Sequence, residues 1–371
     1  MAKKKKIEPY DIEEAFRVIE EELLSSLKRN LQRHINDELE VGKTYEMWQA
    51  EQLKALQQYR FVDNKHFKQR YSKLNRQIEA LLRETWRDAR LNEENAILRR
   101  VAGFKKETVK EKDPRLLDSE KLDALVSATV NDIQKAEYAT LRMLDDQYRK
   151  IIFNAQVYLN TGSGTLRQSI DMATKDFYAR GIDCITYKDG RRINITSYSE
   201  MALRTANTRA KLQGEAEARD EYGLSLVIIT RRGVACPKCQ PFCGRVCIDD
   251  VYGSGKPDGE HPLLSEFIEQ GLYHPNCKDS HSTYYEGISP KPQPMTKAEQ
   301  AEAQRIYDLE QQQRYNERQI RKYKRLEAEQ LDPDNIEAAK KKRQEWQRRQ
   351  KEFVDSHEEL RRKYDREKIY L

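Results

Sequence analysis

The sequence has no long apolar run and little hydrophobic material overall. In 371 residues, hydrophobic side chains make up 37% and charged side chains 35%, and the mean hydropathy is -0.96. A membrane-spanning helix needs roughly 18 or more consecutive apolar residues. No stretch approaches that length, so we expect no membrane segment. A composition this polar also argues against one large hydrophobic core, and it predicts long, solvated helices.

Signals for export and for nucleotide binding are absent as well. The lysines at residues 3–6 are followed by Ile7-Glu8-Pro9-Tyr10-Asp11, not by the apolar stretch of a signal peptide. We therefore expect a soluble protein made in a cytoplasm. The glycine-containing turns at residues 160–164 and 253–256 lack the Gly-x-x-x-x-Gly-Lys-Ser/Thr pattern of a phosphate loop, so no nucleotide site is predicted.

The net charge is small compared with the number of charged residues. There are 68 basic and 62 acidic residues, which gives +6, and the two signs are interspersed, as on exposed helices. The basic clusters at residues 3–6 and 340–343 could contact phosphate, although a solvated tail is the simpler account of each. Any contact with DNA is therefore expected to be non-specific.

Cysteine and histidine are concentrated in one short stretch, residues 234–287, which holds five of the six cysteines and three of the six histidines. A Cys-x-x-Cys turn, Cys236 to Cys239, places two thiolates on one side of a cation. A distant His-x-x-Cys pair, His274 and Cys277, supplies two more ligands in a tetrahedral set that suits Zn²⁺. The spacing therefore predicts a structural zinc site made by these four residues.

Other assignments of this cluster stay open. Cys243, Cys247 and His281 lie close enough in sequence to be additional or substitute ligands, and a second metal ion is an alternative. A disulfide-bonded loop or a set of buried thiols would use the same cysteines. Disulfides are disfavoured because nothing marks the chain for export and reducing compartments keep thiols free.

Helical periodicity dominates the N-terminal region. Apolar residues recur every three to four positions over residues 11–36, 45–59 and 65–86, with Asn64 as the expected N-cap of the third helix. These helices predict a hairpin or small bundle whose apolar stripes pack either on each other or on a partner. Residues 101–118 show little periodicity and are predicted to be a linker.

The middle of the chain mixes helix and strand signals. A long helix capped by Ser119 is followed by a predicted helix over residues 165–180, which Gly181 ends, and by a predicted hairpin around Asp189-Gly190. A Ser197/Glu200 capping box predicts the start of a helix over residues 197–222. Strands are predicted near residues 224–230 and 245–251. The strands flank the Cys-x-x-Cys turn. A metal ion there would let a small core fold.

The C-terminal region is almost entirely made of helix-forming residues. A helix is predicted over residues 301–330, and Asp332-Pro333 predicts the start of another. Ala339, Trp346, Phe353 and Leu360 repeat at seven residues and form a narrow apolar seam. We expect an extended element that docks on a partner or weakly self-associates through these C-terminal helices, with a free solvated helix as the alternative.

These patterns predict a mainly α fold with a small zinc-stapled α+β core and long extended helices at both ends. The expected division is an N-terminal helical region (1–100), a linker (101–118), a long helix (119–163), the α+β core with its zinc-binding knuckle (164–290) and a charged helical tail (291–371).

Several motifs, taken in order, resemble those of one protein family. They are Gly181 to Tyr187 with Gly190-Arg191-Arg192, Arg204-Thr205-Ala206-Asn207-Thr208-Arg209, Cys236-x-x-Cys239 with Gly244-Arg245-Val246, His274-Pro275-Asn276-Cys277 with Tyr284-Tyr285-Glu286-Gly287, and the tail segment at residues 314–322. The chain resembles the tailed-phage minor capsid protein 2 family, which is related to the Mu F-like head morphogenesis proteins. Two residues after Cys277, where that family commonly has His or Cys, this chain has Asp279, so the fourth ligand stays open.

The resemblance implies a structural protein of the phage head, assembled in the host cytoplasm and present in the virion. It implies association with portal and capsid proteins and a part in procapsid assembly, DNA packaging or delivery. The alternative is a zinc-dependent nucleic-acid-binding protein or nuclease. An enzyme is not expected, because the His-x-Glu and Pro-Cys-x-x-Cys pattern of zinc deaminases is absent and a cation with four protein ligands has no open position for water.

Overall fold

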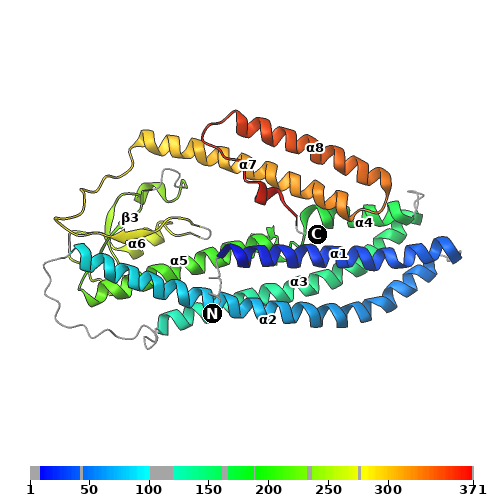
Figure 1. Ribbon diagram of the computed structural model, residues 1–371, viewed down its shortest axis with the longest axis horizontal. Coiled ribbons are helices and arrows are strands. Elements are labelled where there is room, and N and C mark those ends of the chain that lie inside the picture. Colours follow the sequence, from blue (N-terminus) through cyan, green and yellow to red (C-terminus); the bar gives the residue numbers. More distant parts are fainter. Residues whose placement is uncertain are drawn as a thin grey trace, which may run out of the picture. The chain divides into compact units, whose positions relative to one another are not determined.

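The computed structural model describes residues 9–41, 45–100, 120–160, 166–187, 189–231, 236–274 and 277–369. The predicted linker at 101–118 and the predicted cap Ser119 lie outside them. Over the described residues the protein is mainly helical, with two small antiparallel sheets (Figure 1). None of the described helices is both long and apolar enough to cross a membrane.

The elements follow in chain order. They are α1 (Pro9–Val41), α2 (Tyr45–Arg100), α3 (Glu120–Asn160), α4 (Leu166–Arg180), β1 (Ile185–Thr186), β2 (Arg192–Ile193), α5 (Ile195–Glu221), β3 (Leu226–Ile229), the 3-10 turn η2 (Gln240–Phe242), β4 (Val246–Ile248), α6 (Leu264–Glu269), β5 (His281–Thr283), α7 (Lys297–Glu329), α8 (Pro333–Asp355) and the 3-10 turn η3 (Tyr364–Glu367).

The chain forms two compact units. Unit 1 takes the described residues within 75–132 and 200–308, and unit 2 takes those within 10–74, 133–199 and 309–369. Helices α2, α3, α5 and α7 each contribute residues to both units. The division into five consecutive segments stays a prediction.

One long helix replaces two predicted ones. The helices expected at residues 45–59 and 65–86 are parts of α2, so the prediction of an N-cap at Asn64 was wrong. Residues 45–100 contain neither glycine nor proline. An asparagine inside a helix costs only about 0.7 kcal/mol relative to alanine, so it does not end a helix that is propagated from both sides.

The apolar stripe of α1 lies in the core of unit 2. This burial confirms the predicted periodicity of the helix. Of the two predicted alternatives, it favours packing of the stripe on the protein's own helices over packing on a partner protein. The stripe residues are each at most 2% exposed: Ile12, Phe16, Ile19, Leu23, Leu27 and Leu31.

The predicted hairpin around Asp189-Gly190 is confirmed in unit 2. Strands β1 and β2 are antiparallel, with Ile185 opposite Ile193, and Gly190 has a φ of +80°, a conformation that glycine adopts without a steric cost. The predicted capping box was wrong, because α5 begins before Ser197. The Asn194 side chain accepts hydrogen bonds from the backbone N–H groups of Thr196 (2.9 Å) and Ser197 (3.4 Å) and is the cap.

The C-terminal helices pack on the rest of unit 2 and are not an extended tail, which corrects the prediction. Helices α7 and α8 form an antiparallel hairpin (Figure 1), in which the Arg343 guanidinium contacts the Glu327 carboxylate at 2.5 Å. The buried Asp171 carboxylate of α4 accepts hydrogen bonds from the backbone N–H groups of Leu331 (2.8 Å) and Asp332 (2.9 Å). The turn between the two helices is thereby fixed to α4.

The start of α8 is as predicted, but its seam is not. Asp332 is the N-cap, and its side chain accepts hydrogen bonds from the N–H groups of Asp334 and Asn335, with proline in the first turn. The helix ends at Asp355, so Leu360 does not continue a seven-residue repeat along it. The Trp346 ring contacts the chain's own Tyr315 at 5.7 Å between ring centroids.

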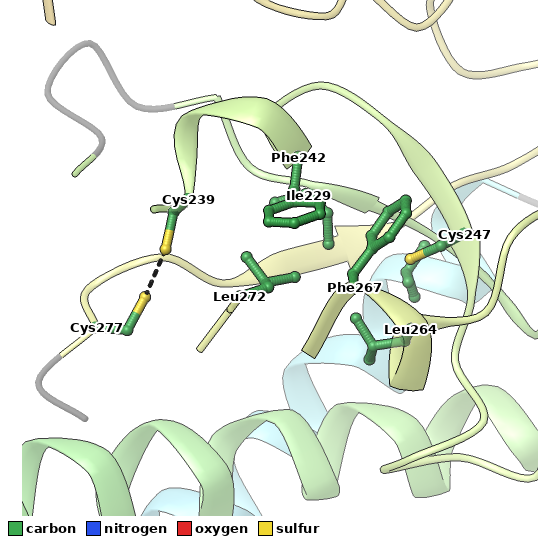
Figure 2. Close-up of a cluster of buried hydrophobic side chains, with 9 residues drawn as sticks. Ile229, Cys239, Phe242, Cys247, Leu264, Phe267, Leu272 and Cys277 are labelled. Carbon is green, nitrogen blue, oxygen red and sulfur yellow. Dashed lines mark hydrogen bonds between the residues drawn. The ribbon is translucent and has the colours of Figure 1, made fainter. Parts of the chain in front are cut away.

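The small sheet of unit 1 has the strand order β4-β3-β5, all antiparallel. Val227 of β3 lies opposite Cys247 of β4, and Ile229 lies opposite His281 of β5. Figure 2 shows the hydrophobic cluster beside this sheet, whose buried members are Val227, Ile229, Cys239, Phe242, Cys247, Leu264, Phe267, Leu272 and Cys277.

Helices α2 and α5 approach closely within unit 1. A Cβ atom at Gly214 would lie 2.3 Å from the Trp86 carbonyl oxygen, so only glycine fits at this crossing. The contact is reinforced by the Trp86 indole N–H, which donates a hydrogen bond to Glu217 at 3.2 Å, and by a salt bridge between Arg90 and Glu217.

Candidate metal centre

Two tight turns carry the predicted metal ligands. In the first, between β3 and β4, the Cys239 N–H donates a hydrogen bond to the Cys236 carbonyl at 2.9 Å, and the Gln240 N–H donates to the same oxygen. In the second, before β5, the Cys277 N–H donates to the His274 carbonyl at 2.9 Å. Each turn holds its two ligand side chains close together.

The predicted ligand atoms come together in two cross-turn pairs. The Cys236 sulfur lies 2.9 Å from His274 Nε2, and the Cys239 sulfur lies 3.4 Å from the Cys277 sulfur. Figure 2 shows the latter two sulfurs facing each other at the edge of the hydrophobic cluster. Tetrahedral zinc with Zn–S bonds of about 2.3 Å and Zn–N bonds of about 2.0 Å would set these separations at about 3.8 Å between sulfurs and about 3.5 Å between sulfur and nitrogen. These two contacts are within about 0.6 Å of the separations that a shared zinc ion would set.

The close ligand atoms form two groups that share one cysteine. In each group all ligand atoms lie within 4.8 Å of one another: Cys236, Cys239 and His274 make the first group, and Cys239, Cys277 and Asp279 make the second. Cys239 belongs to both and joins them. The chemistry of this donor set, three thiols, an imidazole and a carboxylate, fits Zn²⁺.

Asp279 is the site residue that the sequence analysis did not count as a ligand. Its side chain is 3% exposed, and its Oδ2 atom lies 3.6 Å from the Cys277 sulfur. Its backbone N–H donates to the same sulfur at 3.4 Å. Among the described residues, no basic side chain forms a salt bridge with this carboxylate, although a buried charge ordinarily needs a partner. A bound cation would supply that partner.

The thiols of Cys239 and Cys277 influence each other's protonation. The pKa of Cys277 is lowered, because the Cys239 thiol donates a hydrogen bond to it, and the same hydrogen bond raises the pKa of Cys239. The contact between the two sulfurs thus favours the thiolate form of Cys277, and a thiolate is the form that binds metal.

The other two cysteines of the stretch have structural surroundings. The Cys243 thiol donates to the Cys239 carbonyl at 3.4 Å and packs with Met295 and Ala303. Cys247 lies in the hydrophobic cluster, where burial raises the pKa of its thiol to about 12. Neither cysteine enters a group of close ligand atoms in the described part of the chain.

His281, the third substitute ligand considered, lies in a buried polar network. Its Nε2 atom is 3.6 Å from the Asp249 carboxylate and 3.4 Å from the Arg219 guanidinium, and that guanidinium forms a salt bridge with Asp249 at 2.5 Å. Burial lowers the pKa of His281 to about 3, so the ring is neutral. It is 2% exposed and belongs to neither group of close ligand atoms.

Tyr273 joins this network to the metal centre. It is the one non-glycine with a positive φ (+55°) among the described residues, a conformation that costs roughly 1–2 kcal/mol. Its hydroxyl lies 3.0 Å from Nδ1 of His281, and the next residue is His274. The left-handed turn therefore directs one side chain to the buried histidine and the next one to Cys236. The sequence gives no signal for this, since tyrosine is not expected in that conformation.

Comparison with known proteins identifies the family of the chain. The family model described as "Phage minor capsid protein 2" matches residues 5–355. The chain belongs to this family. The chain is also similar to a "Structural protein" of Lactococcus phage LL-H, at 24% identity over 290 residues, which cover 75% of this chain and 76% of that relative. No solved structure matches. The resemblance read from the ordered motifs is confirmed.

Proposed function

We propose that this protein is a minor structural component of a tailed-phage head, bound to the portal and present in the virion. The match of the family model to residues 5–355 carries the proposal, because it covers both units and not only the Cys/His stretch. Roles in procapsid assembly, in DNA packaging or in delivery follow from such a position, and assembly takes place in the host cytoplasm.

The proposed metal is a structural Zn²⁺ ion held by Cys236, Cys239, His274 and Cys277, with the Asp279 carboxylate beside them. When bound, the ion would supply a fixed cross-link between the turn before η2 and the turn before β5. The module it joins has strands of only three or four residues, and a metal commonly replaces missing hydrophobic core in so small a unit.

An enzymatic role is not proposed. A Zn²⁺ ion with four protein ligands offers no open coordination position for a substrate or a reactive water. Of the other two histidines in the Cys/His stretch, His281 is buried beside the Tyr273 hydroxyl, and burial lowers its pKa to about 3, which makes it a weak base. His261 contacts the Asp258 carboxylate at 2.7 Å and lies outside the groups of close ligand atoms that the described residues form. The family match over residues 5–355 supports a structural protein instead.

Mass spectrometry of purified phage particles and procapsids tests the proposal. We expect this chain in both, at a copy number similar to that of the portal protein and far below that of the major capsid protein. Cross-linking in the same particles should join it to the portal. Absence from both particles would overturn the proposal and favour a soluble nucleic-acid-binding factor.

A further inference from the structure

The antiparallel hairpin of α7 and α8 carries a row of alternating arginine and aromatic side chains within unit 2. The Arg318 guanidinium lies over the Tyr315 ring (5.9 Å to the centroid), Tyr315 contacts Trp346 edge to face (5.7 Å), and the Arg349 guanidinium lies over the Trp346 ring (4.9 Å). Tyr315 is 41% exposed, and both arginines are exposed. We call these four residues the arginine–aromatic row.

The two arginines of the row form no salt bridge with the described carboxylates, unlike several other arginines of the same hairpin. Among the described residues neither Arg318 nor Arg349 forms a salt bridge, whereas other arginines of residues 309–369 pair with acidic side chains: Arg314 with Glu310, Arg325 with Glu20 and Glu21, Arg343 with Glu327, Arg362 with Glu367, and Arg366 with Glu317. Neither guanidinium of the row is therefore held in a salt bridge by the described carboxylates, although the charge of Arg349 acts on Glu345 at longer range.

An arginine that lies on an aromatic ring keeps its hydrogen-bond donors available. The ring contacts the face of the guanidinium, while the N–H groups point outward in the guanidinium plane, in a fork that matches phosphate oxygens. The ring also restricts the long side chain, so less conformational entropy is lost when it binds a ligand. Arg318 and Arg349 are thus ordered before any partner arrives.

The surrounding charge also favours an anion. Residues 309–371 contain 18 basic and 14 acidic residues, so this segment carries four of the six excess positive charges of the chain. Two acidic residues flank Arg349 on α8, Glu345 and Glu352. The nearest cation to Glu345 is Lys342, at 2.8 Å. Arg348, next to Arg349, is exposed as well.

We propose that the arginine–aromatic row binds the phosphate backbone of duplex DNA without reading its sequence. Phosphate is favoured because the forked guanidinium donors of the row match phosphate oxygens. Base stacking is not expected, since guanidinium groups lie over the Tyr315 and Trp346 rings. This inference goes beyond the proposed head role, which does not require this chain to touch DNA.

A salt titration of binding tests the proposal on the full chain. The probe is a fluorescently labelled 20-base-pair duplex, read by anisotropy from about 50 to 200 mM salt. Replacing both arginines, Arg318→Gln with Arg349→Gln, should weaken binding at least about tenfold near 0.1 M salt and lower the salt slope by about 2, because each phosphate contact contributes about 0.9 to that slope.

The matched control removes the same charge from paired arginines of α7. Arg305→Gln with Arg314→Gln breaks salt bridges to Glu302 and Glu310 and should change the affinity less than about twofold. Equal losses in the two double variants would overturn the proposal, because only total charge would then matter. Circular dichroism of each variant checks that the helices are intact.

Two further measurements locate the contact and identify its partner. DNA should change the intrinsic tryptophan fluorescence of the protein, and Trp346→Phe should remove most of that change although Trp48 and Trp86 remain. Polyglutamate competes for the same arginines if the natural partner is an acidic protein segment. Binding of polyglutamate as tight as that of DNA, with the same loss in the arginine variant, would overturn the assignment to DNA.

Discussion

At the level of single residues, Tyr273 has a positive φ that no other described non-glycine residue shares, and it contacts or adjoins two histidines of the site region. Its hydroxyl contacts His281, which sits with Arg219 and Asp249 in a network fully buried inside unit 1. Its successor is His274, a candidate zinc ligand. A strained residue held between two ordered groups is typical of a positioning role. We infer that the contact with His281 fixes the direction of His274.

The change Tyr273→Phe tests this positioning role. Losing the hydroxyl leaves the buried Nδ1 atom of His281 without this partner, and one hydrogen bond of about 1 kcal/mol corresponds to a roughly fivefold change in an equilibrium constant. We expect the affinity for Zn²⁺, measured by competition with a chelator of known affinity, to fall by about that factor.

The matched control for this change is Tyr252→Phe. The Tyr252 ring also lies against His281, at 5.9 Å between centroids, but it does not precede a metal ligand. Its substitution should leave zinc affinity unchanged. Equal losses in the two variants would show that Tyr273 supports the fold in general and does not position His274.

The sequence predicts those ligands of the metal centre that lie close together in the chain, two on each turn. Cys236 with Cys239 and His274 with Cys277 each lie on one turn, so their spacing is readable directly. Asp279 lies only two positions after Cys277, so its contact is local, and the sequence left the fourth ligand open at this position. His281 was considered as a ligand although it contacts Arg219, 62 positions away. That contact depends on how β5 pairs with β3, which residue spacing does not encode.

At the level of elements, the helices were predictable where a local signal decided them. The start of α8 needs only Asp332 and the proline after it, and the stripe of α1 recurs over many turns. The predicted helix break at Asn64 was wrong. The free-energy cost of an asparagine inside a helix is small, and it does not interrupt a helix that contains no glycine or proline on either side. The packing of α7 against α1 had no sequence signal, because it rests on buried charged side chains.

That packing of α7 against α1 predicts an unusual pH dependence. Burial raises the pKa of Glu21 in α1 to about 8, an effect that Arg325 and Arg321 of α7 only partly offset and that Glu20 and Glu329 reinforce. A carboxyl whose pKa is higher in the folded state stabilises the fold most below its unfolded pKa of about 4.5. That stability is then lost as the pH rises toward 8, at up to about 1.4 kcal/mol per pH unit.

The substitution Glu21→Gln removes this titrating group while keeping the shape of its protonated form. Urea denaturation of wild type and variant should give similar free energies of unfolding near pH 4.5, with the variant increasingly more stable as the pH approaches 8. Glu22→Gln is the control, since Glu22 is 40% exposed in its contact with Arg70 and exposed ion pairs contribute about 1 kcal/mol or less. Parallel pH profiles for wild type and Glu21→Gln would contradict the assignment.

At the level of the whole molecule, all the candidate ligands belong to unit 1 and none to unit 2. The sheet that the metal would brace has strands of three or four residues, so its hydrophobic cluster is small. Unit 2 instead buries long helical stripes such as that of α1. Metal binding is therefore expected to be coupled to the folding of one part of the chain only.

Hydrogen exchange with and without a chelator measures that coupling. Under reducing conditions, removing the metal should abolish amide protection in β3, β4, β5 and the ligand turns, and leave that of α1, α4 and α8 unchanged. The double variant Cys236→Ser with Cys239→Ser should behave in the same way without chelator, while Cys184→Ser, in unit 2, should not. Loss of protection in both units together would mean that the two fold as one cooperative body, and that the zinc-held module does not have a local stability of its own.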